Sequence, residues 1–348
     1  MESFRVSVLG STGILGQRFL SLISKLPNFE LSHISSSDSK YGKRLSNSVK
    51  WIIDDDYPEE YGDFKIDNTH DIGTISRESD IVFSALPTDA SSVEIEFAKK
   101  IPVISKSSLN RMLPDVPLFV PGVSHDQLEI LHYQRRNNNY SGFITCDANC
   151  SSTQLSIAIK PLIDLSIDDI VVDTMQAISG SGYPGLSSMD IADNVIPYIE
   201  KEDEKIITET PKIMGKHRSG TIIPMNLNIT AMCNRVNVTD GHMESVFLKL
   251  NDPPELDEIV KRMSSQRNLI IDTKIPLFPE KLLMVNLNKG RPQPRLDRRL
   301  NGGMSVIAGG FKLSGNWLSF TTLSHNTILG GAGSALVQAG ILISRGMI

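Results

Sequence analysis

The sequence predicts an α/β protein with two parts, a domain built on a parallel sheet and an α+β domain whose sheet is mostly antiparallel. The length of 348 residues is too great for one ordinary core, so two domains are expected. Up to about residue 149, short apolar strand-like runs alternate with helix-like segments, which is typical of a parallel sheet. After Cys150, long strand-like runs follow one another with few helices between them, which favours antiparallel pairing.

The positions of the expected elements follow from apolar periodicity. In the first part, strands are expected at 5–9, 29–34, 80–84, 102–105 and 143–145, and helices at 14–26, 90–100 and 125–136. In the second part, strands are expected at 170–177, 225–238, 243–250, 304–313 and 317–323. The segment 329–345 is rich in Gly, Ala, Leu and Ile and predicts a single apolar helix.

The composition excludes several classes of protein. With 40% hydrophobic and 22% charged residues and a net charge of −5, the chain is typical of a soluble globular protein that binds neither nucleic acid nor a membrane. It has no apolar run of about 18 residues, and its start does not have the pattern of a signal peptide, so we expect a cytoplasmic protein. Its three cysteines form no CxxC pair and no Cys/His cluster, which argues against disulfides and against a metal site.

Three glycines follow the first expected strand and open the first expected helix, in the order Gly10, Gly13 and Gly16. Such a turn lets the backbone approach a pyrophosphate, whose charge the helix N-terminus stabilises. The spacing GxxGxxG is less common than GxGxxG, so a merely structural turn remains an alternative. We therefore expect a dinucleotide to contact the turn, at Gly10, Ser11, Thr12, Gly13, Ile14 and Leu15.

The end of the second expected strand discriminates between two dinucleotides. An NAD site usually has an acidic side chain at this place. Here the chain has Ser35, Ser36 and Ser37, followed by Asp38 and Lys40. Hydroxyl groups and a cation suit a 2′-phosphate, so NADP is favoured, while Asp38 leaves NAD open.

These observations lead to a domain division. We expect residues 1–149 and 326–348 to form a Rossmann-like NADP-binding domain, because the segment 329–345 must bury its apolar face. Residues 150–325 are expected to form an α+β domain with a mostly antiparallel sheet.

Cys150 stands where an apolar pattern of helical spacing begins. In the first turn of a helix, unpaired N–H groups and the helix dipole favour a thiolate over a thiol, which would make Cys150 a nucleophile. The alternative is a small buried residue, which is the usual role of a free cysteine.

A nucleophilic cysteine and a nicotinamide cofactor together indicate aldehyde or acyl chemistry, because a thiohemiacetal can give up hydride and become a thioester. Over nearly its whole length the chain resembles the aspartate-β-semialdehyde dehydrogenase family, and most closely its archaeal and fungal branch. Eight motifs carry the resemblance: GSTGILGQRF, VKW, DIVFSALP, MLPDVPLFVP, NCSSTQL, QAISGSGYPG, NRVNVTDGH and SHNTILGGAG. The resemblance implies reversible, NADPH-dependent reduction of aspartyl 4-phosphate to aspartate 4-semialdehyde with release of phosphate. This step leads toward lysine, methionine, threonine and isoleucine.

The resemblance also implies residue roles. Cys150 matches the nucleophile, His242 the acid/base, expected in a turn between two strands, and Gln176 the residue that orients the substrate. For the substrate it implies Arg235 at the carboxylate, Arg111 and Lys205 at the phosphate, Glu202 at the ammonium group, and Asn149 before the nucleophile. Further cofactor contacts are implied at Leu86, Pro87, Ser179, Gly180, Gly182 and Asn326. The resemblance further implies that residues 150–325 form the catalytic and dimerisation domain, and that the protein is a homodimer or homotetramer.

Two departures and three alternatives accompany this interpretation. Lys106 follows Ser105 where the family usually has Asn, and Gly122 and Ser124 stand in PGVS where it usually has Pro-Glu-hydrophobic-Asn. Both departures are expected near cofactor or subunit contacts and away from the nucleophile.

Malonyl-CoA reductase, which uses the same scaffold, is the main alternative. N-acetylglutamyl-phosphate reductase fits the motifs poorly, and a catalytically inactive regulator would not need Cys150 or His242.

Overall fold

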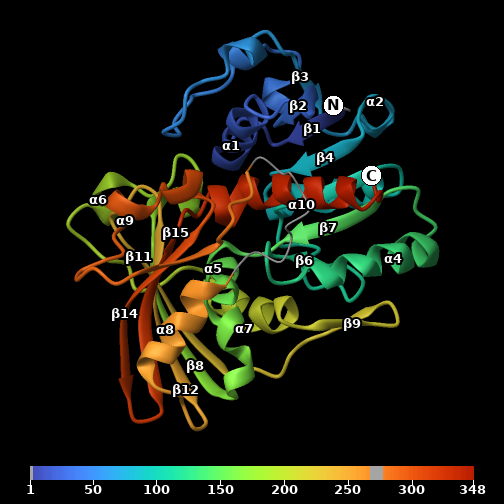
Figure 1. The fold of residues 1–348 in the computed structure, drawn as a ribbon. Coiled ribbons are helices and arrows are strands. Elements are labelled where there is room, and N and C mark those ends of the chain that lie inside the picture. The colour runs from blue at the N-terminus through green and yellow to red at the C-terminus, as the bar shows by residue number, and fades with distance from the viewer. Residues whose placement is uncertain (1–2, 267–276) are drawn as a thin grey trace.

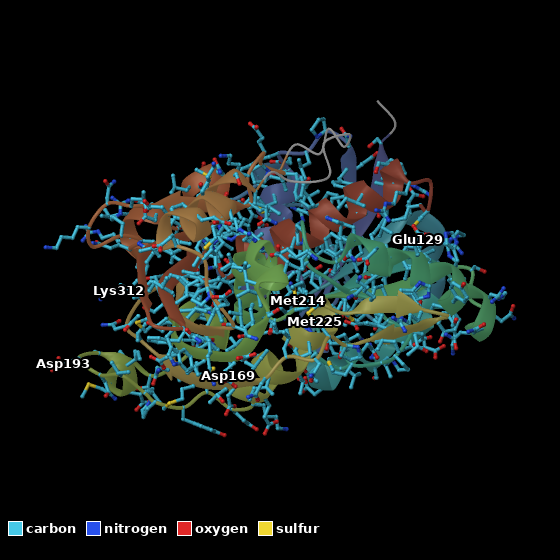
Figure 2. The ribbon with its side chains drawn as sticks, turned by 60° about the horizontal axis from the view of Figure 1, so that its bottom comes forward. Glu129, Asp169, Asp193, Met214, Met225 and Lys312 are labelled. Atoms are coloured by element: carbon cyan, nitrogen blue, oxygen red, sulfur yellow. The ribbon has the colours of Figure 1, made fainter. Side chains whose placement is uncertain are left out.

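The computed structural model describes residues 3–266 and 277–348. Two sheets form the centres of two domains that lie side by side, with the helix α10 running along the first of them (Figure 1). Figure 2 shows the same arrangement from another side: Glu129 marks the first domain, whereas Asp169, Asp193 and Lys312 mark the second.

The first domain has a seven-stranded sheet in the order β3-β2-β1-β4-β5-β7-β6. All of its pairs are parallel, as expected. Its strands are β1 (Phe4–Leu9), β2 (Phe29–Ser36), β3 (Ile66–Asn68), β4 (Ile81–Ser84), β5 (Pro102–Ser105), β6 (Leu118–Phe119) and β7 (Phe143–Asp147). The helices between them are α1 (Ile14–Ile23), α2 (Ile72–Glu78), α3 (Glu94–Ala98) and α4 (Ile130–Asn138).

The carboxyl ends of the central strands lead into the loops that matter for the site. Such strand ends meet at one edge of a parallel sheet, where ligands bind in folds of this class. The loops after β1, β4, β5 and β7 begin at Gly10, Ala85, Lys106 and Ala148.

The second domain contains a six-stranded sheet in the order β11-β8-β12-β15-β14-β13. The strands are β8 (Ile167–Gln176), β11 (Ile229–Arg235), β12 (His242–Leu250), β13 (Leu283–Asn286), β14 (Val306–Ser314) and β15 (Trp317–Ser324). The helices α5 (Cys150–Ile159) and α7 (Glu202–Ile213) pack on this sheet, α5 against β12 and β15 and α7 against β11. Smaller elements are α6 (Ser188–Ile191), α8 (Leu256–Ser265), α9 (Pro294–Asp297) and the hairpin β9 (Lys216–Arg218) and β10 (Thr221–Ile223).

The expectation of a mostly antiparallel sheet is wrong, because the six-stranded sheet is mixed. β12 is antiparallel to β8 and β15, and β15 is antiparallel to β14. The two edge strands, however, pair in parallel, β11 with β8 and β13 with β14. Each parallel pair is joined by a long connection, which contains α7 in one case and α9 in the other. Parallel neighbours need such crossovers, and strand periodicity alone does not reveal them.

The C-terminal segment differs from the single expected helix. A π-helical turn at Ile328–Ala332 precedes α10 (Gly333–Ser344), because Gly331 leaves helical geometry with φ −142° and ψ −124°. Two buried hydrogen bonds tie α10 to β7: Ser334 Oγ donates to Asp147 at 2.7 Å, and Gln338 Nε2 donates to Thr145 at 2.6 Å. In the described parts of the chain, no helix is both long and apolar enough to cross a membrane.

We predict that Gly16→Ala destabilises the protein. A side-chain carbon at Gly16 would lie 2.2 Å from the carbonyl oxygen of Gly10, so α1 would have to move away from the turn after β1. Overpacking of this kind costs about 1–3 kcal/mol of unfolding free energy, which urea unfolding measures. The control is Gly73→Ala in α2, where the nearest atom would be 3.9 Å away. Equal unfolding midpoints for the two variants would contradict the prediction.

Candidate active site

A cleft between the two domains contains all of the expected catalytic and substrate-binding residues. Its volume is about 930 Å³, and it opens at the carboxyl edge of the parallel sheet. The first domain contributes Gly13, Ile14, Leu15, Leu86, Pro87, Lys106 and Arg111 to its lining. Later segments contribute Asn149, Cys150, Gln176, Ser179, Gly180, Gly182, Glu202, Lys205, Arg235, His242 and Asn326. The sequence therefore identified residues that the fold brings together from both domains.

Cys150 is the first residue of α5, directly after the end of β7 and Asn149. The Asn149 side chain caps the helix, since its Oδ1 accepts hydrogen bonds from the N–H groups of Ser151 and Ser152 at 2.9 and 3.1 Å. On another side, the π-helical turn lies against the cysteine: a side-chain carbon at Gly330 would be 2.6 Å from Cys150 Cβ. Only glycine allows this approach, so the thiol is held between two backbone segments while it remains partly exposed to the cleft.

The position of Cys150 at the start of α5 is not sufficient to make its thiol a thiolate. Shielding from water raises the pKa of Cys150 to about 12, and the negative charge of Glu202 acts in the same direction. Lys106, Arg111 and Lys205 lower this pKa. Cys150 lies in the first turn of α5, a position that favours a thiolate, but shielding from water acts in the opposite direction. The local sequence did not reveal this shielding.

His242 is fully buried and begins β12, paired with Ser324, whereas the sequence placed it in a turn. The backbone N–H of Ala177 donates to His242 Nδ1 at 3.0 Å. Burial lowers the pKa of His242 to about 3, and Arg235 adds to this effect, so the imidazole is neutral near neutral pH. Because Nδ1 accepts, the ring proton is on Nε2, an atom that has no hydrogen-bond partner among the described residues. His242 is thus prepared to donate a hydrogen bond into the cleft.

Gln176 and Arg235 lie next to each other at the ends of paired strands, β8 and β11. Gln176 Nε2 donates to Ser151 Oγ in the first turn of α5 at 3.2 Å. Arg235 Nη1 donates to the carbonyl of Ala177 at 2.7 Å, and its side chain is buried. The parallel pair that the sequence did not predict therefore carries two of the predicted site residues.

One face of α7 is directed at the start of α5. Glu202 accepts from Asn149 Nδ2 at 2.7 Å and from Lys205 Nζ at 3.0 Å. Glu209, which sequence reasoning missed, accepts from the backbone N–H of Asn149 at 2.6 Å and from Arg111 Nη1 at 2.9 Å. The sequence could have indicated Glu209, because it follows Glu202 by seven residues and Lys205 by four. This spacing places all three side chains on one face of the helix.

Lys106 is the second site residue that the sequence analysis did not assign. The expectation that it lies away from the nucleophile is wrong. Its Nζ donates to Asp147 Oδ2 at 3.1 Å and to the carbonyl of Gly330 at 3.3 Å, and Gly330 contacts Cys150. The Lys106 carbonyl accepts from Arg111 Nη2 at 2.7 Å. Sequence distance hid this placement, because Gly330 and Lys106 are 224 residues apart.

The glycine turn fits a dinucleotide. Gly10 has a φ of +78°, a conformation that glycine adopts without strain, and the turn leads directly into α1. Beyond it, Thr12 Oγ1 lies 2.8 Å from Lys40 Nζ and 2.6 Å from Ser36 Oγ. A cation and two hydroxyl groups thus lie together at the ends of β1 and β2, which is the chemistry that a 2′-phosphate needs.

Other expected cofactor residues are placed differently. Ser11 and Ser35 are fully buried and bond within the protein, Ser11 Oγ to the Ser35 carbonyl and Ser35 Oγ to Thr69. The hydroxyl groups of Ser11 and Ser35 are therefore occupied within the protein, and contact of Ser11 with a ligand stays a prediction for its backbone. Ser37 is exposed and bonds to Ser39. Asn326 donates to Ser179 Oγ at 2.8 Å and accepts from the Gly241 N–H at 2.9 Å, so both ends of its amide have protein partners.

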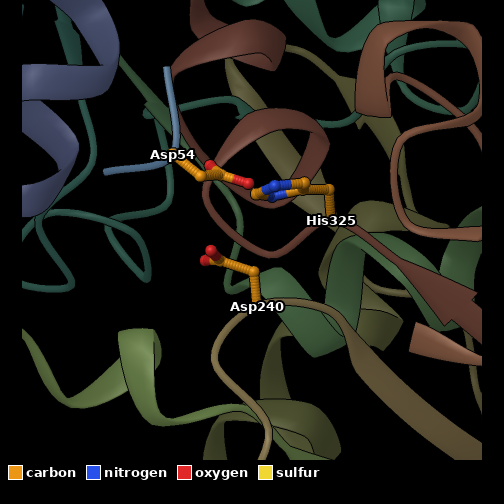
Figure 3. Close-up of side chains that lie close together, drawn as sticks. All are labelled: Asp54, Asp240 and His325. Carbon is orange, nitrogen blue, oxygen red and sulfur yellow. The ribbon is translucent and has the colours of Figure 1, made fainter. Parts of the chain in front are cut away.

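Asp54, Asp240 and His325 form the described group most similar to a metal site, with their ligand atoms within 4.8 Å of one another (Figure 3). Asp54, however, is paired with Arg18 at 3.1 Å and with Arg299 at 2.5 Å. These arginines neutralise the carboxylate and would repel a cation. We therefore assign to this group the role of an ion-pair network that links α1 to the second domain.

Comparisons with known proteins agree with this geometry. The family description "Semialdehyde dehydrogenase, NAD binding domain" matches residues 5–131, and "Semialdehyde dehydrogenase, dimerisation domain" matches residues 159–329. The aspartate-semialdehyde dehydrogenase of Methanothermobacter thermautotrophicus is 39% identical over 342 residues, which cover 97% of this chain and 98% of the relative. That of Saccharomyces cerevisiae is 37% identical and covers 98% of both chains.

Solved structures lead to the same conclusion. The aspartate semialdehyde dehydrogenase with NADP from Candida albicans has a TM-score of 0.91 and 32% identity, covering 99% of this chain and 100% of the other. A Vibrio cholerae structure with 20% identity and a TM-score of 0.77 shares the fold. The resemblance to archaeal and fungal relatives is confirmed by full-length matches of 34–39% identity. From the cleft, its cysteine and these relatives together, we conclude that the chain belongs to the aspartate-semialdehyde dehydrogenase family.

Proposed function

We propose that the protein catalyses the reversible, NADPH-dependent reduction of L-aspartyl 4-phosphate to L-aspartate 4-semialdehyde and phosphate, through a thioester on Cys150. The observation that carries this proposal is the cleft itself. It combines a cysteine at a helix N-terminus with Gln176, His242 and three cationic side chains, Arg111, Lys205 and Arg235. The reaction would supply the lysine, methionine, threonine and isoleucine pathways from the cytoplasm.

The domain division is part of this proposal. Residues 1–149 and 326–348 form the NADP-binding domain, which the hydrogen bonds between α10 and β7 support. Residues 150–325 form the catalytic and dimerisation domain. Its outer sheet face exposes Val171, Met232, Phe247 and Trp317, an apolar surface suited to a homodimer or homotetramer.

NADP would be held at the glycine turn and along the cleft. Thr12, Ser36 and Lys40 would bind the 2′-phosphate, with Ser37 beside them, and the turn from Gly10 to Leu15 would face the pyrophosphate. Leu86, Pro87, Ser179, Gly180, Gly182 and Asn326 would line the remainder. When bound, the cofactor supplies or accepts the hydride.

The chain's own residues perform the covalent steps. In the direction of semialdehyde oxidation, the Cys150 thiolate adds to the aldehyde carbon, and His242 Nε2–H donates a hydrogen bond to the oxyanion that forms. After the loss of hydride, phosphate attacks the thioester carbonyl, and the carbon–sulfur bond breaks to return the thiolate. The hydrogen bond to His242 Nδ1 favours this donating role.

Charge complementarity assigns the substrate contacts. Arg235 suits the α-carboxylate and Glu202 the ammonium group, while Arg111 and Lys205 suit the phosphate. Malonyl-CoA carries no ammonium group, so the buried Glu202 beside Asn149 favours the amino acid phosphate over malonyl-CoA as substrate. Malonyl-CoA reduction is the alternative function.

The proposed function predicts that the protein forms NADPH from semialdehyde, phosphate and NADP, measured by absorbance, and does not oxidise NADPH with malonyl-CoA.

Cys150→Ser should abolish turnover, because a serine hydroxyl stays protonated near neutral pH, while NADP binding persists. The matched control is Cys233→Ser, which changes a buried cysteine of β11 that lies outside the cleft lining. Substantial activity in Cys150→Ser would contradict the covalent mechanism.

We predict different effects for the two arginines. Semialdehyde has a carboxylate but no phosphate, so Arg111→Leu should raise KM for phosphate and change KM for semialdehyde little. Arg235→Leu should do the reverse and also lower kcat through misplacement of the carbonyl. Loss of a charge-assisted contact is worth about 1.5–3 kcal/mol, or roughly 10- to 150-fold in KM. If both variants raised only the semialdehyde KM, Lys205 alone would be left as the phosphate ligand.

We predict that Lys40→Ala weakens NADP binding and leaves NAD binding nearly unchanged, because NAD has no 2′-phosphate for this ammonium group. Loss of one charge-assisted contact should weaken NADP binding roughly tenfold or more in calorimetric titration. Lys43→Ala is the matched control, since Lys43 is exposed and its Nζ donates to the Ser39 carbonyl nearby. Equal losses for both dinucleotides would move the 2′-phosphate site elsewhere.

A further inference from the structure

We propose that Lys106 is a positioning residue for the nucleophile: its ammonium group, held between Asp147 and the carbonyl of Gly330, stabilises Cys150 as a thiolate. The inference rests on the proposed function, which makes Cys150 the nucleophile. Family resemblance does not supply this role, because the related pattern usually has a neutral Asn at this place.

The placement of Lys106 is built into the fold. The residue follows directly after β5, and its side chain is 3% exposed. The ammonium group contacts Asp147 Oδ2 at 3.1 Å and the Gly330 carbonyl at 3.3 Å. Asp147 Oδ2 also accepts from Ser334 Oγ at 2.7 Å. The loop after β5, the end of β7 and the start of the C-terminal segment therefore meet at one buried cation.

Both acceptors of Lys106 belong to the immediate surroundings of the thiol. Asp147 ends β7, three residues before Cys150. Gly330 packs on the cysteine, since a side-chain carbon there would lie 2.6 Å from Cβ and 3.0 Å from Cα of Cys150. Lys106 also lines the cleft together with Cys150. The positive charge is thus held beside the backbone segments that enclose Cys150 before any substrate enters.

The site needs such a charge, because its histidine is not arranged to take the thiol proton. Nδ1 of His242 accepts from a backbone N–H, which leaves the ring proton on Nε2. The charged groups that line the cleft with the thiol are Lys106 and Arg111 after β5, Glu200, Glu202 and Lys205 before and on α7, and Arg235 on β11, together with His242 on β12. Asp147 is the ion-pair partner of Lys106. Among the cations that lower the pKa of Cys150, Lys106 has the largest effect.

Lys106 differs from the other cations of the cleft because it is not proposed to bind any group of the substrate. Arg111 and Lys205 are paired with carboxylates of α7 and are proposed to turn toward phosphate, and Arg235 toward the α-carboxylate. The side chain of Lys106 forms no hydrogen bond with the residues that are proposed to bind the substrate. Its charge is therefore available to the thiolate in the free enzyme and after the thioester breaks.

The test is the pH dependence of Cys150 alkylation by iodoacetamide, which reacts with the thiolate and needs no turnover. Site-resolved mass spectrometry of the full chain separates Cys150 from Cys146 and Cys233. Below the pKa of the thiol, Lys106→Met should react about tenfold more slowly than the wild type, which corresponds to a rise of one pKa unit. Lys106→Arg keeps the charge and should restore most of the rate.

A double variant separates charge from packing. Lys106→Met alone leaves the buried carboxylate of Asp147 without its cationic partner, which can impair folding. Lys106→Met/Asp147→Asn removes both charges and avoids this problem. The double variant should remain slow and its pH profile shifted upward. A wild-type profile in either variant would overturn the proposal. Lys99→Met, which removes an exposed lysine paired with Glu96, should leave the profile unchanged.

The same samples distinguish failure of this inference from failure of the proposed function. If the wild type forms no NADPH from semialdehyde and phosphate but the alkylation profile shifts in Lys106→Met, the proposed function is wrong and the assignment of Lys106 stands. If the wild type is active and the profile does not shift, the assignment of Lys106 is wrong and the proposed function stands.

Discussion

Asn149 is held by two buried carboxylates of α7, and the geometry of the site depends on this contact. Glu202 binds its side-chain amide, and Glu209 binds its backbone N–H. The Asn149 oxygen is thereby left to cap α5, so that the start of the helix and Cys150 are fixed together. Because Glu209 also binds Arg111, the proposed phosphate ligand Arg111 and the proposed nucleophile Cys150 share one rigid support.

The cleft is built from balanced charges. Arg111 faces Glu209, Lys205 faces Glu202, and Lys106 faces Asp147. Isolated buried charges are costly, and pairing offsets part of that cost. A substrate that carries both signs of charge can then exchange partners with the site without leaving a charge unpaired in a dry environment.

Local sequence patterns predicted much of this fold. The parallel first sheet, the turn from Gly10 into α1 and the start of α5 at Cys150 all depend on neighbouring residues. The mixed second sheet was not predictable in this way, since edge pairing depends on which distant strands meet. The same reason explains Lys106, whose acceptor at Gly330 is distant in the chain. Burial is equally non-local, and it raises the pKa of Cys150 and keeps the Ser35 hydroxyl group away from the cleft.

The attachment of α10 to β7 has a consequence for how the protein folds. Its two hydrogen bonds join residues 187 and 193 positions apart, so the first sheet obtains its last packing partner only after the whole second domain lies between them. Contacts between such distant segments slow folding, because a long loop must close before they form. We therefore expect the surroundings of Cys150 to be among the last parts of the chain to assemble, and a partly folded chain would lack the carbonyl of Gly330 beside Lys106.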